Sequence, residues 1–291
     1  MADKQETSKL FKYKGFNFIS NVHDEKFLDT LENFEIHESD ICSVTYPKSG
    51  TVWMQYILSL MFYSDEVTGE KAKMTTEVCP WIEVYTKKFD YNKFPSQRLF
   101  VSHLPWDLIP DGLRKRGKVI YLARNPKDVA VSYYHFHKYI ACLESEENFD
   151  TFLDRFLEGN VFGSSWFDHI KDWYSHKDQF DFLFLTYEEM KKDLRSTIVK
   201  ISNFVGKKLE DKTIDMIVEK GTFKRMQNNP IANYKSLCKI HLNSSEGTFL
   251  RKGTVGDWKN IFTVAQNEKF DAIYQKKMED FGLDLVWEIS E

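Results

Sequence analysis

Three short apolar runs, each followed by a helix-like pattern, restrict the fold of this chain more than any other sequence feature. They span residues 40–46, 118–124 and 181–187. Short runs that are nearly continuous in apolar residues are typical of strands buried on both faces of a parallel sheet. Strands that alternate with helices favour an α/β fold, with a central parallel sheet flanked by helices. We expect a single domain over residues 1–291, a length that one α/β domain can reach.

Helix-start and helix-stop residues follow two of these runs. Asn125 can cap a helix, and Pro126 suits the first helical position. Thr186 and Glu189 have the spacing of a capping box, and Gly206 suits the end of the helix that follows. Ligands of parallel sheets bind at the carboxyl ends of the strands, so we expect the functional site there.

The first run leads into Lys48, Ser49, Gly50 and Thr51, where a helical pattern begins. The N–H groups at the start of a helix lack partners and lie at the positive end of its dipole. A loop of small residues lets an anion approach them, and lysine adds a charge. The order differs from the nucleotide phosphate loop, which ends in Gly-Lys-Ser/Thr. An ordinary turn with an exposed lysine is the alternative interpretation.

Further candidates for anion binding lie in two other segments. Arg124 follows the second run, and Ser132 lies two helical turns later, so both are expected to face one crevice. Arg251, Lys252 and Gly253 place two adjacent cations before a glycine, which suits a phosphate dianion. Taken alone, Arg251 and Lys252 could lie in a solvated turn, and Ser132 could be a serine that only packs on the helix surface.

One histidine is a candidate general base. His103 follows a short apolar run and precedes a proline, and imidazole accepts protons near neutral pH. A purely structural histidine is the alternative. His135 and His137 do not suggest a metal site, because helical residues two apart point in different directions. We therefore expect no metal.

Composition excludes several classes of function. The net charge is −4, which argues against a broad nucleic-acid surface. No stretch reaches 18 apolar residues, the length that spans a membrane, and the first residues carry no signal-like apolar core. The four cysteines form no CxxC pair. These observations predict a cytoplasmic enzyme. Residues 224–253 have weak periodicity and are a candidate lid loop, or a surface excursion with a short helix.

Five ordered segments resemble the cytosolic sulfotransferases, across roughly residues 10 to 290. The segments are TYPKSGTVW (45–53), SHLP (102–105), RNPKDVAVSYYHF (124–136), FLRKGTVGDWK (249–259) and KNIFTVAQNE (259–268). The chain is most similar to the amine- and hydroxysteroid-handling branches, judged by SHLP and by residues 163–174 and 229–234.

The resemblance implies that the donor is 3′-phosphoadenosine 5′-phosphosulfate (PAPS), whose sulfuryl group passes to a hydroxyl or amine of a small apolar acceptor such as a phenol, steroid or arylamine. It implies His103 as general base and Lys48 as the residue that stabilises the leaving group. The donor-binding residues it implies are Lys48, Ser49, Gly50, Thr51, Val52, Trp53, Arg124, Ser132, Tyr187, Thr222, Phe223, Met226, Phe249, Leu250, Arg251, Lys252 and Gly253. The acceptor-binding residues it implies are Trp81, Tyr85, His103, Phe136, His137 and Tyr234.

The resemblance also implies a homodimer through residues 259–268. Two other functions stay open at this point. A nucleotide kinase would need the Gly-Lys-Ser/Thr order and a Mg²⁺ carboxylate, and a non-catalytic PAPS-binding protein would not need both Lys48 and His103.

Overall fold

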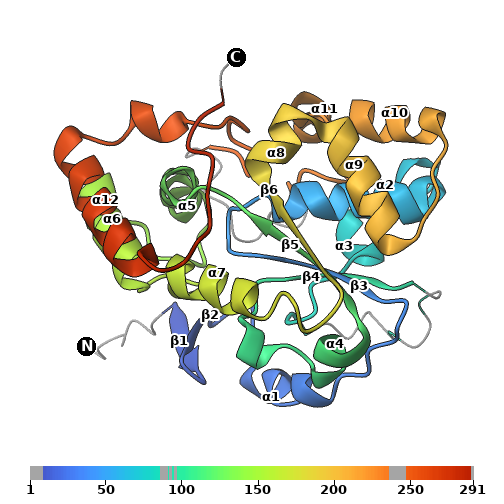
Figure 1. Ribbon diagram of the computed structural model, residues 1–291, viewed down its shortest axis with the longest axis horizontal. Helices are drawn as coiled ribbons and strands as arrows, with labels where there is room; N and C mark the ends of the chain where they lie inside the picture. Colours follow the sequence, from blue (N-terminus) through green and yellow to red (C-terminus); the bar gives the residue numbers. More distant parts are fainter. Residues whose placement is uncertain (1–8, 86–90, 92–93, 95–96, 236–246, 290–291) are drawn as a thin grey trace, which may run out of the picture.

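The computed structural model describes residues 9–85, 91, 94, 97–235 and 247–289, and a four-stranded parallel sheet lies at its centre (Figure 1). The strand order is β4-β3-β5-β6. The strands are β3 (Ile41–Thr45), β4 (Leu99–Ser102), β5 (Lys118–Ala123) and β6 (Phe182–Thr186). Ser43 pairs with Val101 on one side and with Ile120 on the other, which places the carboxyl ends of neighbouring strands at one edge of the sheet.

The three predicted strands are confirmed as β3, β5 and β6, within one residue at either end. The short apolar run before His103 forms the fourth strand, β4, at the edge beside β3. Residues 80–82 extend the sheet beyond β4 by a parallel bridge between Trp81 and Val101. This bridge matters for the site, because it brings Trp81 next to the end of β4.

Alternate residues of each strand belong to two separate cores. Val119 and Tyr121 of β5 face one core, and Ile120 and Leu122 face the other. The two cores differ in chemistry, since the first is rich in aromatic side chains and the second is mainly aliphatic. The longer helices of the first core are α5 (Pro126–Tyr139), α6 (Phe149–Glu158), α7 (Trp166–Ser175) and α12 (Val264–Met278). Those of the second are α2 (Thr51–Thr68), α9 (Leu194–Val205) and α10 (Asp211–Lys220).

The expected helix boundaries are present. The Asn125 side chain accepts the N–H of Asp128, and Pro126 begins α5. Thr186 and Glu189 form the capping box of α8 (Tyr187–Lys192). Gly206 ends α9 with a φ of 74°, a left-handed conformation that glycine adopts without steric cost.

Shorter elements complete the described part of the chain. They are β1 (Leu10–Tyr13), β2 (Phe16–Ile19), α1 (Glu25–Leu28), α3 (Thr75–Val78), α4 (Asp111–Arg116), α11 (Phe223–Asn228) and the 3₁₀ turns Leu31–Asn33, Trp106–Leu108 and Asp257–Asn260. The candidate lid segment begins inside α11, while its residues 236–246 lie outside the described part.

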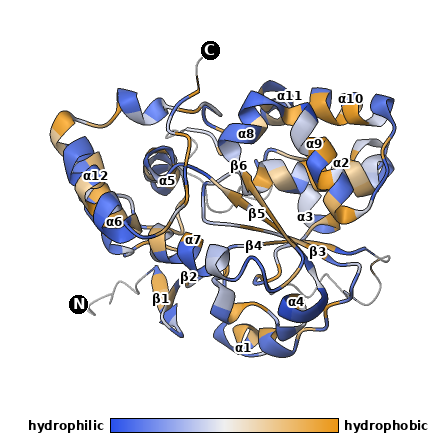
Figure 2. Cartoon of the chain, viewed as in Figure 1, coloured by the Kyte–Doolittle hydropathy of each residue, from blue (hydrophilic) through white to orange (hydrophobic). Residues whose placement is uncertain are grey.

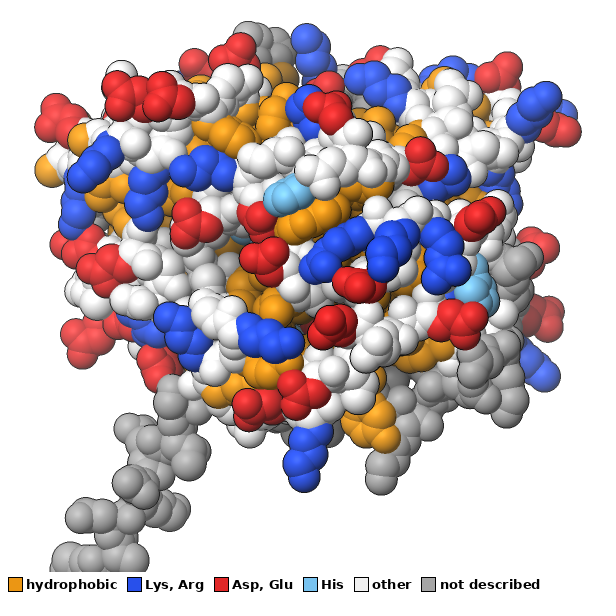
Figure 3. Space-filling model, turned by 60° about the horizontal axis from the view of Figure 1, so that its bottom comes forward, with side chains coloured by type: hydrophobic (Ala, Val, Ile, Leu, Met, Phe, Trp, Pro, Cys, Tyr) orange, Lys and Arg blue, Asp and Glu red, His pale blue; other side chains and the backbone are white. Residues whose placement is uncertain are grey.

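Hydropathy and charge follow this layering. Strands β5 and β6 are coloured as hydrophobic in Figure 2, and the outer helix α4 as hydrophilic. On the face drawn in Figure 3, acidic and basic side chains are interspersed rather than gathered by sign. Within the described residues, no helix combines the length and the apolar character needed to cross a membrane.

Candidate active site

A cavity of about 630 Å³ lies where the four strands end. Its lining includes Lys48 after β3, His103 after β4, Arg124 after β5 and Tyr187 after β6. Every strand of the sheet therefore delivers at least one side chain to the same cavity. This is the position at which open parallel sheets bind their ligands.

The loop after β3 has the backbone of an anion-binding turn. Lys48 has a φ of 70° and Gly50 a φ of 108°, so two residues of the loop are left-handed. A Cβ on Gly50 would lie 2.9 Å from the Tyr187 ring, which leaves room only for glycine. The Ser49 hydroxyl is buried and has no hydrogen-bond partner among the described residues. A ligand that accepts a hydrogen bond would satisfy it, and the oxygens of a phosphosulfate fit this requirement.

Arg124 is held by the loops on either side of it. Its Nη1 donates to the Lys48 carbonyl at 3.1 Å, and its Nη2 donates to the Thr254 carbonyl at 3.0 Å. Its guanidinium also lies over the Tyr187 ring, 4.3 Å from the ring centroid. These contacts orient the guanidinium toward the cavity wall, and the buried Glu188 carboxylate interacts with its charge from nearby.

Arg251 and Lys252 line the same cavity but share one carboxylate. Arg251 Nη2 lies 2.5 Å from Asp257, and the Lys252 ammonium contacts the other oxygen of that carboxylate. Burial raises the pKa of Asp257, but the two ion pairs outweigh this effect and lower it to about 2. Gly253 follows with a φ of 67°, and a Cβ there would overlap the Phe223 ring.

The loop that carries these cations is braced by α5 and by the C-terminal segment. The Asp128 carboxylate accepts the N–H groups of Gly256 at 2.7 Å and Trp258 at 3.0 Å. The indole N–H of Trp258 donates to the Trp287 carbonyl at 3.2 Å. The Lys127 ammonium lies 4.4 Å from the Trp258 ring centroid and 5.1 Å from that of Trp287. The C-terminal residues therefore support the loop from behind.

His103 is fixed in one tautomer. Its Nδ1 lies 2.7 Å from the Thr45 carbonyl, which can only accept, so Nδ1 carries the proton. Nε2 is then the proton acceptor. The main-chain N–H of His103 donates to the buried Glu83 carboxylate at 2.8 Å. Burial lowers the pKa of His103 to about 3, so the ring is neutral near pH 7.

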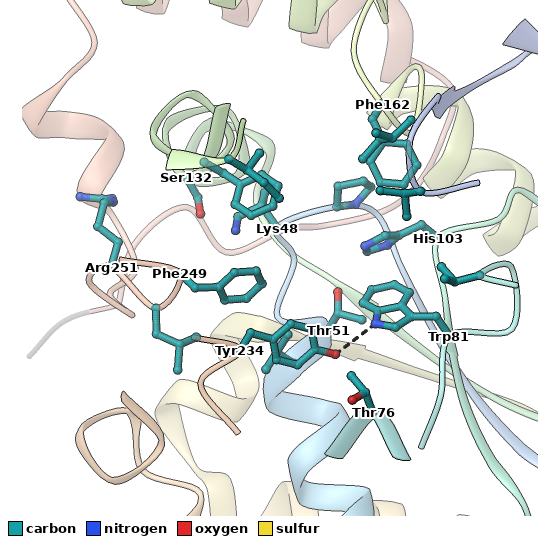
Figure 4. A pocket seen from close by; sticks show the side chains of 18 of the residues that line it. Lys48, Thr51, Thr76, Trp81, His103, Ser132, Phe162, Tyr234, Phe249 and Arg251 are labelled. Atoms are coloured by element: carbon teal, nitrogen blue, oxygen red, sulfur yellow. Dashed lines mark hydrogen bonds between the residues drawn. The ribbon is translucent and has the colours of Figure 1, made fainter. Parts of the chain in front are cut away.

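Aromatic side chains form the wall around His103. The Trp81 ring centroid lies 4.6 Å from that of His103. The Trp81 indole N–H donates to the Tyr234 hydroxyl at 3.0 Å (Figure 4). The Tyr234 hydroxyl donates in turn to Gln55 at 2.6 Å. Tyr234 stacks on Phe249 with 5.0 Å between ring centroids. This part of the cavity is mainly aromatic. The Trp81, Tyr234 and Gln55 side chains are bonded to one another, whereas one oxygen of the buried Glu83 carboxylate has no hydrogen-bond partner among the described residues.

Lys48 lies between the cationic and the aromatic parts of the cavity. In Figure 4, Arg251 and Ser132 lie at one end, His103 and Trp81 at the other, and Lys48 between them. The Lys48 ammonium lies 3.8 Å from the ring centroid of Phe136 and 4.8 Å from that of Phe249. It is therefore placed to act on charge at the junction of the two parts.

Most of the residues predicted for the site line this one cavity. They are Lys48, Thr51, Val52, Trp81, His103, Arg124, Ser132, Phe136, Tyr187, Phe223, Tyr234, Phe249, Leu250, Arg251, Lys252 and Gly253. The other predicted residues are not among its lining residues. They are Ser49, Gly50, Trp53, Tyr85, His137, Thr222 and Met226.

Some of these seven residues support the wall from behind, and two lie elsewhere. The Trp53 indole N–H donates to the Gly221 carbonyl at 2.8 Å, and its ring meets Tyr187 edge to face. His137 is buried against Tyr133 and bonded through Nδ1 to the Glu144 carbonyl. Tyr85 is 50% exposed and packs on Phe27 outside the cavity.

Sequence reasoning missed several residues of the site, and three of them have defined contacts with its functional side chains. Glu83 and Phe162 line the cavity beside His103, and Asp257 pairs with both loop cations. Glu83 comes close only through the bridge between residue 81 and β4, a contact that periodicity does not reveal. Asp257 lies inside the quoted segment 249–259, so its proximity to the adjacent cations was a usable signal.

Comparisons with known proteins place this geometry in context. The Sulfotransferase domain model matches residues 38–282. An amine sulfotransferase of Oryctolagus cuniculus is 45% identical over 97% of this chain and 95% of its own. Sulfotransferase 2B1 of Mus musculus is 39% identical over 97% of this chain and 83% of its own. The solved structure of mouse sulfotransferase SULT7A1 complexed with PAP has a TM-score of 0.80 at 34% identity, covering 94% of this chain and 95% of that one.

Proposed function

The chain belongs to the sulfotransferase family, and from this premise we propose that it transfers the sulfuryl group of PAPS to a hydroxyl or amine of a small apolar acceptor. One observation carries the proposal: Lys48 and His103 line a single cavity, with the cationic part on one side and the aromatic part on the other. The resemblance to cytosolic sulfotransferases is confirmed by these relatives, and the chain is an enzyme of that class.

We assign the donor to the cationic part of the cavity. The helix start at Thr51 and the buried Ser49 hydroxyl suit the 5′-phosphosulfate. Arg124, Ser132 and the loop at Arg251 suit the 3′-phosphate, because fork-shaped guanidinium donors match phosphate oxygens. In support, the solved relative SULT7A1 is a complex with PAP, the donor without its sulfuryl group.

The residues at the junction account for the transfer chemistry. PAPS supplies a sulfuryl group whose bond to the bridging phosphate oxygen breaks while a bond to the acceptor oxygen or nitrogen forms. His103 Nε2 takes the proton that the acceptor loses, a contribution of roughly 10²–10⁴-fold in rate. The Lys48 ammonium offsets the negative charge that remains on the phosphate of PAP, the second product. A cation held beside developing charge contributes about 3–4 kcal/mol.

The acceptor occupies the aromatic part. Trp81, Phe136, Tyr234 and Phe249 make this part apolar, so we expect flat apolar molecules with one reactive hydroxyl or amine. One relative carries the name amine sulfotransferase, and we place amines beside phenols and steroids as acceptor classes to be tried.

A transfer assay tests the function. The purified chain is incubated with sulfur-labelled PAPS and a panel of aromatic amines, phenols and hydroxysteroids, and labelled products are counted. We expect transfer to at least one panel class and none from ATP to the same acceptors. A folded protein that binds PAP but transfers to no acceptor would favour the non-catalytic alternative. Transfer from ATP would favour a kinase.

We also propose that residues 259–268 mediate a homodimer. Val264 begins α12 and is 77% exposed, which is unusual for an aliphatic side chain of this size. A patch of ten residues buries little area, so we expect a dimer that dissociates on dilution. Sedimentation should give a dimer at tens of micromolar for the unmodified chain and a monomer for Val264→Asp. An unmodified chain that stays monomeric at these concentrations would contradict the proposed homodimer.

A further inference from the structure

One carboxylate lies inside the cluster of cations assigned to the 3′-phosphate. Asp257 is 5% exposed, and its two oxygens contact Arg251 and Lys252, while the Asn260 amide donates to one of them at 3.1 Å. Arg251 and Lys252 are more accessible than their partner, with 32% and 45% of their side chains exposed. A buried acid thus holds two cations at the edge of the cavity.

We propose that the Asp257 carboxylate competes with the 3′-phosphate of the nucleotide for Arg251 and Lys252, and so weakens the binding of PAPS and PAP. This inference rests on the proposed function, since it assumes that the nucleotide occupies this cavity. It assigns Asp257 the role of a residue that tunes affinity, without contact with the reacting atoms.

The competition follows from the geometry of the donor-free protein. Arg251 and Lys252 are adjacent in the chain and both positive, so they repel each other when nothing lies between them. Asp257 offsets this repulsion. Because it belongs to the same loop, it does so without the loss of translational entropy that a free anion undergoes on binding. A phosphate that engages the same donors must displace the carboxylate from at least one cation or lie close to it as a second anion. Either event makes the free energy of nucleotide binding less favourable.

Arg124 provides an internal contrast. Its Nη1 and Nη2 donate to two main-chain carbonyls, which orient the guanidinium but leave its full charge uncompensated in those contacts. The two sides of the proposed phosphate site therefore differ: Arg124 donates to neutral carbonyls, whereas Arg251 and Lys252 contact a carboxylate directly. The buried Glu188 carboxylate interacts with the charge of Arg124 without such a direct contact. Among the described residues, a direct ion pair therefore has to be displaced at the second side but not at the first.

The test compares two nucleotides that differ by the 3′-phosphate. Calorimetry measures the dissociation constants of PAP and of adenosine 5′-phosphate for the unmodified chain and for Asp257→Asn. We expect Asp257→Asn to bind PAP roughly 5-fold or more tightly, the lower end of typical coupling between two ligands, and to bind adenosine 5′-phosphate as before. PAP affinity that is unchanged or weaker in Asp257→Asn overturns the inference.

A matched variant controls for the loss of one negative charge. Asp211 on α10 pairs with Arg195 at 2.6 Å and does not line the cavity, so Asp211→Asn should leave the PAP affinity unchanged. If Asp211→Asn tightens PAP binding as much as Asp257→Asn, net charge explains the effect and the inference fails. If the unmodified chain binds no PAP at all, it is the proposed function that fails.

A second readout needs no variant. In a crystal structure of the unmodified chain with PAP, we expect at least one of Arg251 and Lys252 to have left Asp257 for the 3′-phosphate. Both ion pairs intact beside a bound 3′-phosphate would overturn the competition.

Discussion

The two parts of the cavity are built in different ways. The cationic part uses main-chain donors at the start of α2, the loop between β3 and α2 that carries Ser49, and Arg124, which directly follows β5. The aromatic part uses Trp81, Tyr234 and Phe249, which come from loops far apart in the sequence and are joined by ring stacking and one chain of hydrogen bonds. The first part is therefore set by the sheet, and the second by side-chain packing between loops.

Because the two parts are built differently, we expect substitutions in them to affect different substrates. Changes in the cationic part should affect the donor, and changes in the aromatic part should affect the acceptor, while His103 and Lys48 act where the two meet. The variants that follow test whether the cationic and the aromatic part of the cavity function independently of each other.

The largest effect is expected from His103→Ala. Without the Nε2 acceptor, kcat should fall roughly 10²–10⁴-fold, while the PAP dissociation constant changes little. Steady-state kinetics and calorimetry measure the two quantities. His37→Ala removes a histidine that is 45% exposed and distant from the lining, and it should behave like the unmodified chain. A His103→Ala variant with near-normal kcat would remove the proposed base.

Gly50→Ala should damage the donor part selectively. A left-handed alanine costs about 1–2 kcal/mol, and its Cβ would lie 2.9 Å from Tyr187 and 3.1 Å from Leu122. We expect PAP affinity to fall by about tenfold, the equivalent of roughly 1.4 kcal/mol.

Gly206→Ala is the matched control for this variant. Gly206 also has a positive φ, of 74°, but a Cβ there would meet none of the described residues within 4 Å. Gly206→Ala should therefore lower the melting temperature without altering PAP affinity. Equal losses of PAP affinity in both variants would show that the close approach to Tyr187 is unimportant.

Tyr234→Phe should affect the acceptor part. It removes the hydroxyl between the Trp81 indole and Gln55, and an unpaired buried group costs about 1–3 kcal/mol. We expect a several-fold rise in the KM of the acceptor and no change in that of PAPS. Tyr85→Phe, on an exposed ring outside the cavity, is the control. An equal rise for both substrates would contradict the independence of the two parts.

The smallest effect concerns pH. Burial lowers the pKa of His103 to about 3, against an ordinary histidine value near 6.5. A base must be unprotonated, so a lower pKa moves the acid limb of kcat/KM to lower pH. We expect activity at pH 5.5 to stay close to that at pH 7, as measured by initial rates. Burial raises the pKa of the neighbouring Glu83 to about 7, so Glu83→Gln serves as the control. A half-maximal rate near pH 6.5 that persists in Glu83→Gln would show that His103 itself is protonated there.

The same difference explains what the sequence could predict. The strands β3, β5 and β6 were expected within one residue of their observed ends, because runs of buried apolar residues and capping residues are local signals. The cations of the cationic part were expected from local signals too, since Lys48 and Arg124 lie at strand ends and Arg251 and Lys252 precede a glycine.

The acceptor part could not be predicted with the same detail. Phe136 lines the cavity and His137 does not, because neighbouring residues on a helix point about 100° apart and the direction of α5 is set by packing. The position of the Tyr85 side chain depends on where the chain turns after Trp81. The ring packs on Phe27 rather than lining the cavity. Glu83 reaches His103 only through long-range pairing with the edge of the sheet.

The contacts of Trp287 and Glu288 behind the cation-bearing loop carry a practical consequence. A protein that ends before Trp287 would lose the carbonyl that accepts the Trp258 indole N–H, and with it part of the support of the turn that carries Arg251. Nucleotide affinities measured on such a shortened protein would report on the truncation as well as on the enzyme.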